Sequence, residues 1–137
     1  MDIQNLGYTV VQIAHNFGAV AVVGSAFMAL WLAPEQAIKR RQLAWLMLAG
    51  WAVQAASGSA FGALSWLYYG QLPDIHGIAI AALLIKISCA ASGFVLVALY
   101  LYRDQTWAET NAKTIWRTLA ALAATALTAA AFLRWFS

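Results

Sequence analysis

The sequence predicts an all-α integral membrane protein, folded as a bundle of four membrane-spanning helices. Of its 137 residues, 64% are hydrophobic and only 9% are charged, whereas roughly a quarter of the residues are charged in a soluble domain. The mean hydropathy is +0.72. Four apolar stretches, each long enough to cross about 30 Å of hydrocarbon, fill almost the whole chain. We therefore expect a single membrane domain over residues 1–137, with no soluble catalytic domain.

The limits of the four stretches follow from the charges, prolines and turn residues that interrupt them. The expected spans are 8–32, 42–69, 76–102 and 113–135. Pro34 and the polar run 35–41 close the first span, and the turn 70–74 closes the second. Both prolines fall between spans, where a missing N–H costs least. Each stretch exceeds the roughly 20 residues that a spanning helix needs.

The charges of the connecting segments predict the orientation. The second connection has no Lys or Arg. Basic residues lie in or beside the first and third connections: Lys39, Arg40, Arg41, Arg103, Lys113 and Arg117. By the positive-inside rule the two basic connections face the cytoplasm, and both termini face the outer, periplasmic side. The net charge of +3 then reports topology, and no nucleic-acid partner is expected. The expected location is the bacterial inner membrane, crossed several times.

Two ionisable side chains stand at membrane depth, His15 in the first span and Lys86 in the third. Counting about 1.5 Å per residue from the outer span ends places them roughly 10 Å and 15 Å deep, near one level. An unpaired Lys at the bilayer centre costs about 2.5 to 3.5 kcal/mol, and no span contains Asp or Glu. Lys86 is therefore expected to snorkel, lose its proton, reach helical carbonyls or meet an anionic group. That group could be a haem propionate, a quinone oxygen or a lipid phosphate.

The two histidines of the chain, His15 and His76, also have structural interpretations. For His15 the alternative to a ligand or proton-handling role is an interhelical hydrogen bond with Gln54, Ser57 or Gln12. His76 follows a Pro-Asp turn at the start of the third span, where an interfacial cap is the alternative to a ligand.

The second span also carries small residues and one amide at four-residue intervals, which predicts close helix packing: Gly50, Gln54, Gly58 and Gly62.

His15, Gly24 nine positions later, and Lys86 within Leu83-Leu84-Ile85-Lys86-Ile87 form a pattern that resembles the copper-resistance-D-like four-helix membrane proteins. That family is distantly similar to the haem-containing protoporphyrinogen oxidases of the J type. The resemblance covers about the length of the chain and rests on these few positions. It implies that His15 is an axial ligand of a b-type haem and that Lys86 lies close to the same site. Gly24, from the same pattern, and Gln54, on the second span, are further candidate cofactor-binding residues. His76 is the other histidine that could bind the metal.

This sequence departs from the oxidase type at two places. Val22 and Val23 replace the aromatic residue that usually precedes the glycine. After the first span, Leu32-Ala33-Pro34-Glu35 stands where the oxidases carry Pro-Arg and a second histidine. Protoporphyrinogen oxidation is therefore not expected of this chain.

Three functions from different classes are compatible with these residues. The first is a haem b-binding protein that transfers electrons as part of a membrane oxidoreductase, together with a quinone or partner subunits. The second is an accessory subunit without cofactor, packed against other membrane subunits or copies of itself. The third is copper transport, but copper(I) favours Met and Cys ligands, and the chain has three Met and one Cys, Cys89. We favour the redox function.

Overall fold

The computed structural model describes residues 3–136, which form four helices. They are α1 (Ile3–Trp31), α2 (Ala37–Tyr69), α3 (Ile78–Tyr102) and α4 (Gln105–Phe136). The predicted all-α class and four-helix bundle are confirmed for this part of the chain. Helices α1, α3 and α4 are long and apolar enough to cross a membrane. Helix α2 has 33 residues but is less apolar, because tryptophan, glycine, serine and glutamine dilute its aliphatic residues.

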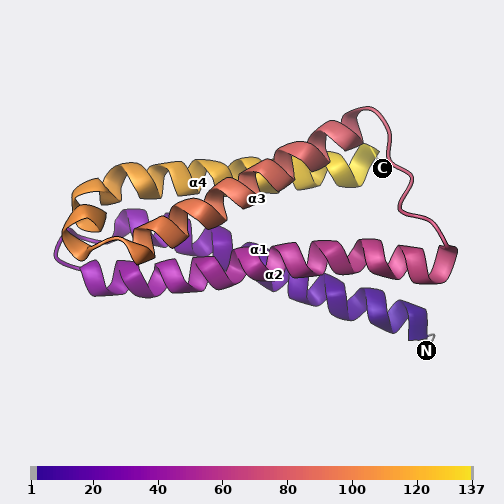
Figure 1. Cartoon of the computed structure of the whole chain (residues 1–137), viewed down its shortest axis with the longest axis horizontal. Helices are drawn as coiled ribbons and strands as arrows, with labels where there is room; N and C mark the ends of the chain where they lie inside the picture. The colour runs from indigo at the N-terminus through magenta and orange to yellow at the C-terminus, as the bar shows by residue number, and fades with distance from the viewer. Residues whose placement is uncertain (1–2, 137) are drawn as a thin grey trace.

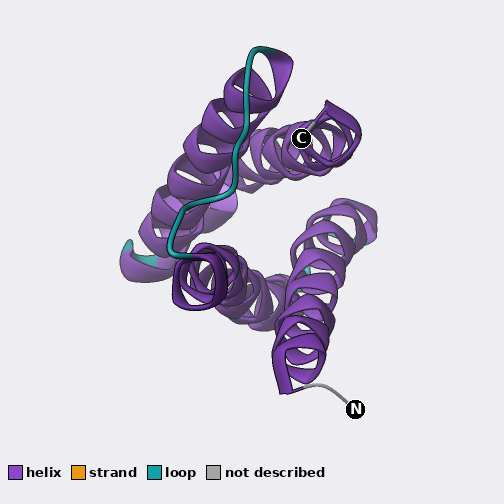
Figure 2. Ribbon diagram, turned by 90° about the vertical axis from the view of Figure 1, so that its right-hand side faces the viewer, coloured by secondary structure: helices purple, strands orange, loops and turns teal. Residues whose placement is uncertain are grey.

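The helices pair as two antiparallel hairpins, α1 with α2 and α3 with α4. The hairpins contact each other through α1 against α4 and α2 against α3, which leaves α1 and α3 diagonally opposed. The connections 32–36 and 103–104 lie together at one end of the molecule, here named the closed end. Both termini and the connection 70–77 lie at the other, named the open end (Figure 1). Figure 2 shows the 70–77 connection passing from one hairpin to the other.

Local signals explain where the helices end. Gly70 terminates α2 in the left-handed conformation, with φ of 68°, which costs glycine nothing. At the start of α4 the Asp104 carboxylate accepts a hydrogen bond from the Trp107 N–H at 3.0 Å and so acts as an N-cap. Helix α4 therefore begins about two turns before the predicted span 113–135. This early start places Glu109 on a helix rather than in a loop.

The packed core lies in the closed half of the bundle. Every buried residue of α1 lies at Gly18 or beyond, towards the closed end. The largest buried side chains come from the other three helices: Met47, Trp51, Val97, Tyr100, Trp116 and Leu119. Between α3 and α4, buried alanines continue the packing towards the open end. Large apolar side chains are exposed along the outside of the bundle, which indicates contact with a lipid bilayer.

Three glycines let the helices of this core approach closely. A Cβ at Gly18 would lie 3.0 Å from Val53, and one at Gly50 would lie 2.9 Å from Val22. A Cβ at Gly93 would lie 2.7 Å from the Trp51 ring. The predicted small-residue ridge of α2 is thus used at Gly50, whereas a Cβ at Gly58 would meet nothing within 4 Å.

Candidate functional site: the Lys86–His15–Ser57 chain

A chain of hydrogen bonds crosses the bundle and links three helices. Lys86 Nζ on α3 lies 3.1 Å from His15 Nε2 on α1. The other ring nitrogen, His15 Nδ1, lies 2.7 Å from Ser57 Oγ on α2. Because α1 and α3 are diagonally opposed, the contact between Lys86 and His15 joins the two hairpins. The predicted common depth of His15 and Lys86 therefore corresponds to direct contact.

The hydrogen-bond network fixes the tautomer of His15. Ser57 Oγ lies 2.6 Å from the carbonyl oxygen of Val53, and a carbonyl can only accept. A serine hydroxyl has one proton, so Ser57 donates it to Val53 and accepts a second hydrogen bond from His15 Nδ1–H. A Lys ammonium has only donors, so Nε2 carries the lone pair and accepts from Lys86. Ser57 and Lys86 therefore indicate the same tautomer, with the proton on Nδ1.

Close packing of α1 on α2 positions the imidazole. The contact between Gly18 and Gly50 brings the two backbones together about one turn away from His15. Gln54, which lies between these levels, donates its side-chain N–H to the carbonyl oxygen of His15. Of the partners predicted for the His15 ring, Ser57 is correct, whereas Gln54 bonds to the backbone. Gln12 instead donates to Asn16 at 2.7 Å.

Lys86 has no carboxylate partner among residues 3–136. The two ion pairs found in this part of the chain are Arg40 with Glu109 and His76 with Asp74. The imidazole acceptor was not among the predicted solutions for Lys86, which were snorkelling, deprotonation, helical carbonyls and an external anion. A neutral imidazole satisfies one N–H of the ammonium but does not balance its charge.

The site lies at the edge of the packed core. His15 and Lys86 are both half-buried. His15 lies about one turn before Gly18, the first buried residue of α1, on the side of the open end. On α2, Phe61 presents its ring edge-to-face with the imidazole, with centroids 5.7 Å apart. The site is therefore enclosed from the closed end and borders the less densely packed open half.

Two other predicted site residues lie away from this chain of hydrogen bonds. The side chain of His76 is 81% exposed in the 70–77 connection and lies 3.3 Å from Asp74. The structure thus does not bring His76 together with His15. Gly24 is exposed, and a Cβ there would meet nothing within 4 Å. Whether either residue belongs to a cofactor site stays a prediction.

His15 shares one hydrogen-bonding feature with metal-bound histidines. A metal-bound histidine usually donates its second ring N–H to a neighbouring acceptor, which orients the ring. His15 does this through Nδ1 and Ser57, and its Nε2 lone pair points towards the diagonal helix. Within the described residues, no second histidine faces this nitrogen. In the described part of the chain no three His, Cys, Asp or Glu side chains group to hold a metal ion.

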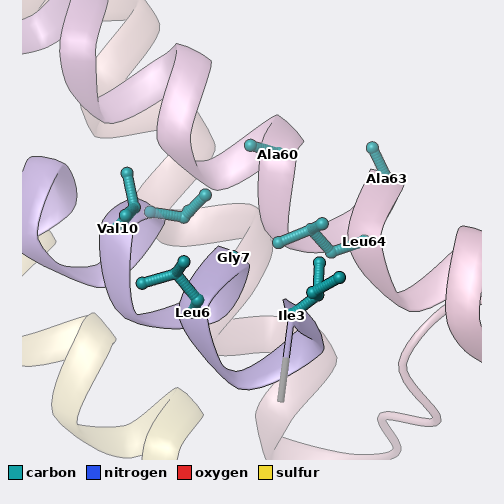
Figure 3. A pocket seen from close by; sticks show the side chains of 8 residues that line it. Ile3, Leu6, Gly7, Val10, Ala60, Ala63 and Leu64 are labelled. Atoms are coloured by element: carbon teal, nitrogen blue, oxygen red, sulfur yellow. The ribbon is translucent and has the colours of Figure 1, made fainter. Parts of the chain in front are cut away.

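Two apolar hollows lie on the hairpins. One, of about 470 Å³, lies between α1 and α2 near the open end (Figure 3). Its lining is aliphatic throughout: Ile3, Leu6, Gly7, Val10, Val11, Ala60, Ala63 and Leu64. The other, of about 450 Å³, lies between α3 and α4 and includes Thr125 and Thr128. Neither hollow is lined by His15 or Lys86.

A second polar cluster, which the sequence did not predict, lies at the closed end. Arg40 on α2 is 5% exposed and contacts Glu109 on α4 through Nε and Nη2. It also donates to the carbonyl oxygens of Ala33 at 2.8 Å and Pro34 at 2.6 Å. Tyr100 on α3 donates to the other Glu109 oxygen at 2.7 Å. The cluster joins both hairpins and the connection between α1 and α2.

The charges of this cluster compensate one another. Burial on its own would lower the pKa of Arg40, but the hydrogen bond and the negative charge of Glu109 outweigh it and raise the pKa. The charge pattern predicted only a role in membrane orientation for Arg40, and the predicted span limits left Glu109 in a connection. The capping signal at Asp104 could have revealed the helical position of Glu109.

The chain was compared with protein-family models, with curated protein sequences and with solved structures, and none of them matched.

Proposed function

We propose that this chain is a haem b-binding membrane protein that takes part in electron transfer, with Nε2 of His15 as the axial ligand. The observation that supports this proposal is the fixed tautomer of His15. Its Nδ1–H is used by Ser57, and its Nε2 lone pair is directed across the bundle. Helical bundles commonly build cofactor sites from side chains on facing helices. When bound, a haem supplies one-electron redox chemistry.

The chain's own residues supply orientation and exclusion of water. Ser57 holds the imidazole ring in place, and Gln54 ties the backbone of His15 to α2. Phe61 packs against the ring from the side of the open end. An apolar side chain beside a metal ligand reduces solvent access on that side, and solvent access affects the reduction potential of a metal site.

The proposed setting is the bacterial inner membrane, with four spans and both termini on the periplasmic side. Antiparallel packing of α2 on α1 supports a fourth crossing, because α2, with 33 residues, is longer than α1, with 29, and lies along it. Basic residues at the closed end support its cytoplasmic location. The electron partner is proposed to be a quinone or a neighbouring membrane subunit.

The test is a reduced-minus-oxidised visible spectrum of the protein purified in detergent from haem-replete cells. We expect the sharp α and Soret bands of a b-type haem in the wild type and in His76→Ala, and their loss in His15→Ala. His76→Ala is the matched control, because it removes an imidazole that lies outside the site. Absence of the bands from the wild type would favour the accessory-subunit function. Equal bands in His15→Ala would remove His15 as the ligand.

A further inference from the structure

We infer that Lys86 competes with the haem iron for Nε2 of His15, so that loading of the cofactor requires the Lys86–His15 hydrogen bond to break. This inference rests on the proposed function and adds to it a residue that controls cofactor binding. In this inference Lys86 opposes the binding of haem at His15 and does not attract the haem.

The geometry makes the two partners of His15 mutually exclusive. Nε2 has one lone pair, and Lys86 Nζ approaches it at 3.1 Å. Iron would need the same electron pair, so the position of the Lys86 ammonium group and the position of the metal overlap. Nδ1 offers no alternative, because it is held by Ser57 at 2.7 Å. An iron bound at Nε2 would share this lone pair, and Lys86 would keep its protons.

The surroundings of Lys86 favour a movable side chain. No carboxylate of the described residues forms an ion pair with it, unlike Arg40 at the closed end. Its helix neighbours Leu84, Ile85 and Ile87 are exposed, and Lys86 itself is only half-buried. A long, flexible lysine can therefore swing away from His15 without leaving a buried charged partner behind.

The test is a titration of haem-free protein in detergent with hemin, followed by Soret absorbance, on the wild type and three variants. Lys86→Met removes the donor and keeps the length of the side chain, and Lys86→Arg keeps a cationic donor. Lys113→Met is the matched control, because Lys113 is an exposed lysine on α4. Hydrogen bonds to charged groups are strong enough that Lys86→Met should tighten hemin binding about tenfold or more.

Lys86→Arg and Lys113→Met should bind hemin as the wild type does. The gain from Lys86→Met should disappear when it is combined with His15→Ala, because Lys86 acts through Nε2 of His15. Lys86→Leu provides a second variant without a donor if Lys86→Met does not fold, as judged by circular dichroism.

Each outcome separates the inference from the proposed function. Hemin binding that is unchanged or weaker in Lys86→Met, while His15→Ala abolishes it, would overturn the competition and leave the haem function standing. A gain that persists in the His15→Ala background would also overturn the competition. Absence of hemin binding from the wild type and from all Lys86 variants would contradict both the inference and the haem function.

Discussion

Arg40, which is buried, and Lys86, which is half-buried, are basic side chains whose partners differ. Arg40 at the closed end contacts the carboxylate of Glu109 and two backbone carbonyls. Lys86 in the middle contacts a neutral imidazole. A buried charge with all its partners in place is costly to disrupt, whereas an ionisable group in a membrane that lacks an opposite charge usually marks a functional site. From this comparison we predict that Arg40 stabilises the fold and that Lys86 acts in the proposed function.

Arg40→Met should produce the largest loss of stability. Removal of one partner from a buried ion pair costs about 3 to 5 kcal/mol, and here it also removes the hydrogen bonds from Arg40 to the carbonyl oxygens of Ala33 and Pro34. The free energy of unfolding can be measured by denaturant titration in detergent with circular dichroism as the signal. Lys39→Met, which removes an exposed neighbouring charge, is the control. Equal stability of the two variants would contradict the structural role of Arg40.

Gly93→Ala should cost about 1 to 3 kcal/mol, because its new methyl group would overlap the buried ring of Trp51. The matched control is Gly58→Ala, where a Cβ would meet nothing within 4 Å. This pair sharpens the comparison, since it measures how much of the stability of the bundle comes from packing between the hairpins. A similar loss in both variants, in the same denaturant titration, would contradict the packing described for α2 and α3.

Lys86→Met should change the free energy of unfolding by less than about 1 kcal/mol. The variant loses a charged hydrogen bond, worth about 1.5 to 3 kcal/mol. It also removes a Lys whose placement in a membrane costs about 2.5 to 3.5 kcal/mol, so the two effects nearly cancel. A loss as large as that of Arg40→Met would show that Lys86 belongs to the fold and would break the comparison.

His76→Ala should have the smallest effect, within about 0.5 kcal/mol of the wild type. Its side chain is exposed, and its contact with Asp74 at 3.3 Å lies in water, where such a pair contributes little. Thermal unfolding of the two proteins in parallel would check this. A clear destabilisation would place the 70–77 connection among the elements that hold the bundle together.

The helices of this chain were more predictable from its sequence than the contacts between them. Apolar runs and turn residues predicted all four helices, and depth counting predicted that His15 and Lys86 lie at one level. Helix α4 begins earlier than predicted because a cap at Asp104 outweighs the polarity of the residues that follow it. The Arg40–Glu109 pair could not be predicted while Glu109 was placed in a loop.

Side-chain pairing at the site depended on contacts that a sequence pattern does not contain. Four-residue spacing predicted a packing ridge on α2, but it did not distinguish Gly50, which faces α1, from Gly58, which is exposed. Rotation of each helix decides such differences, and it is set by tertiary packing. In the same way, the choice of Ser57 for His15 Nδ1 depended on the register between α1 and α2.

The ¹⁵N NMR spectrum of the His15 ring in the haem-free protein tests the central claim most directly. The account predicts a neutral ring with its proton on Nδ1 and an unprotonated, hydrogen-bonded Nε2, and a change at Nε2 when Lys86 is replaced by Met. His76 in the same spectrum is an internal reference for an exposed histidine. A proton on Nε2 of His15 would contradict the account, because that nitrogen could then neither accept from Lys86 nor bind iron.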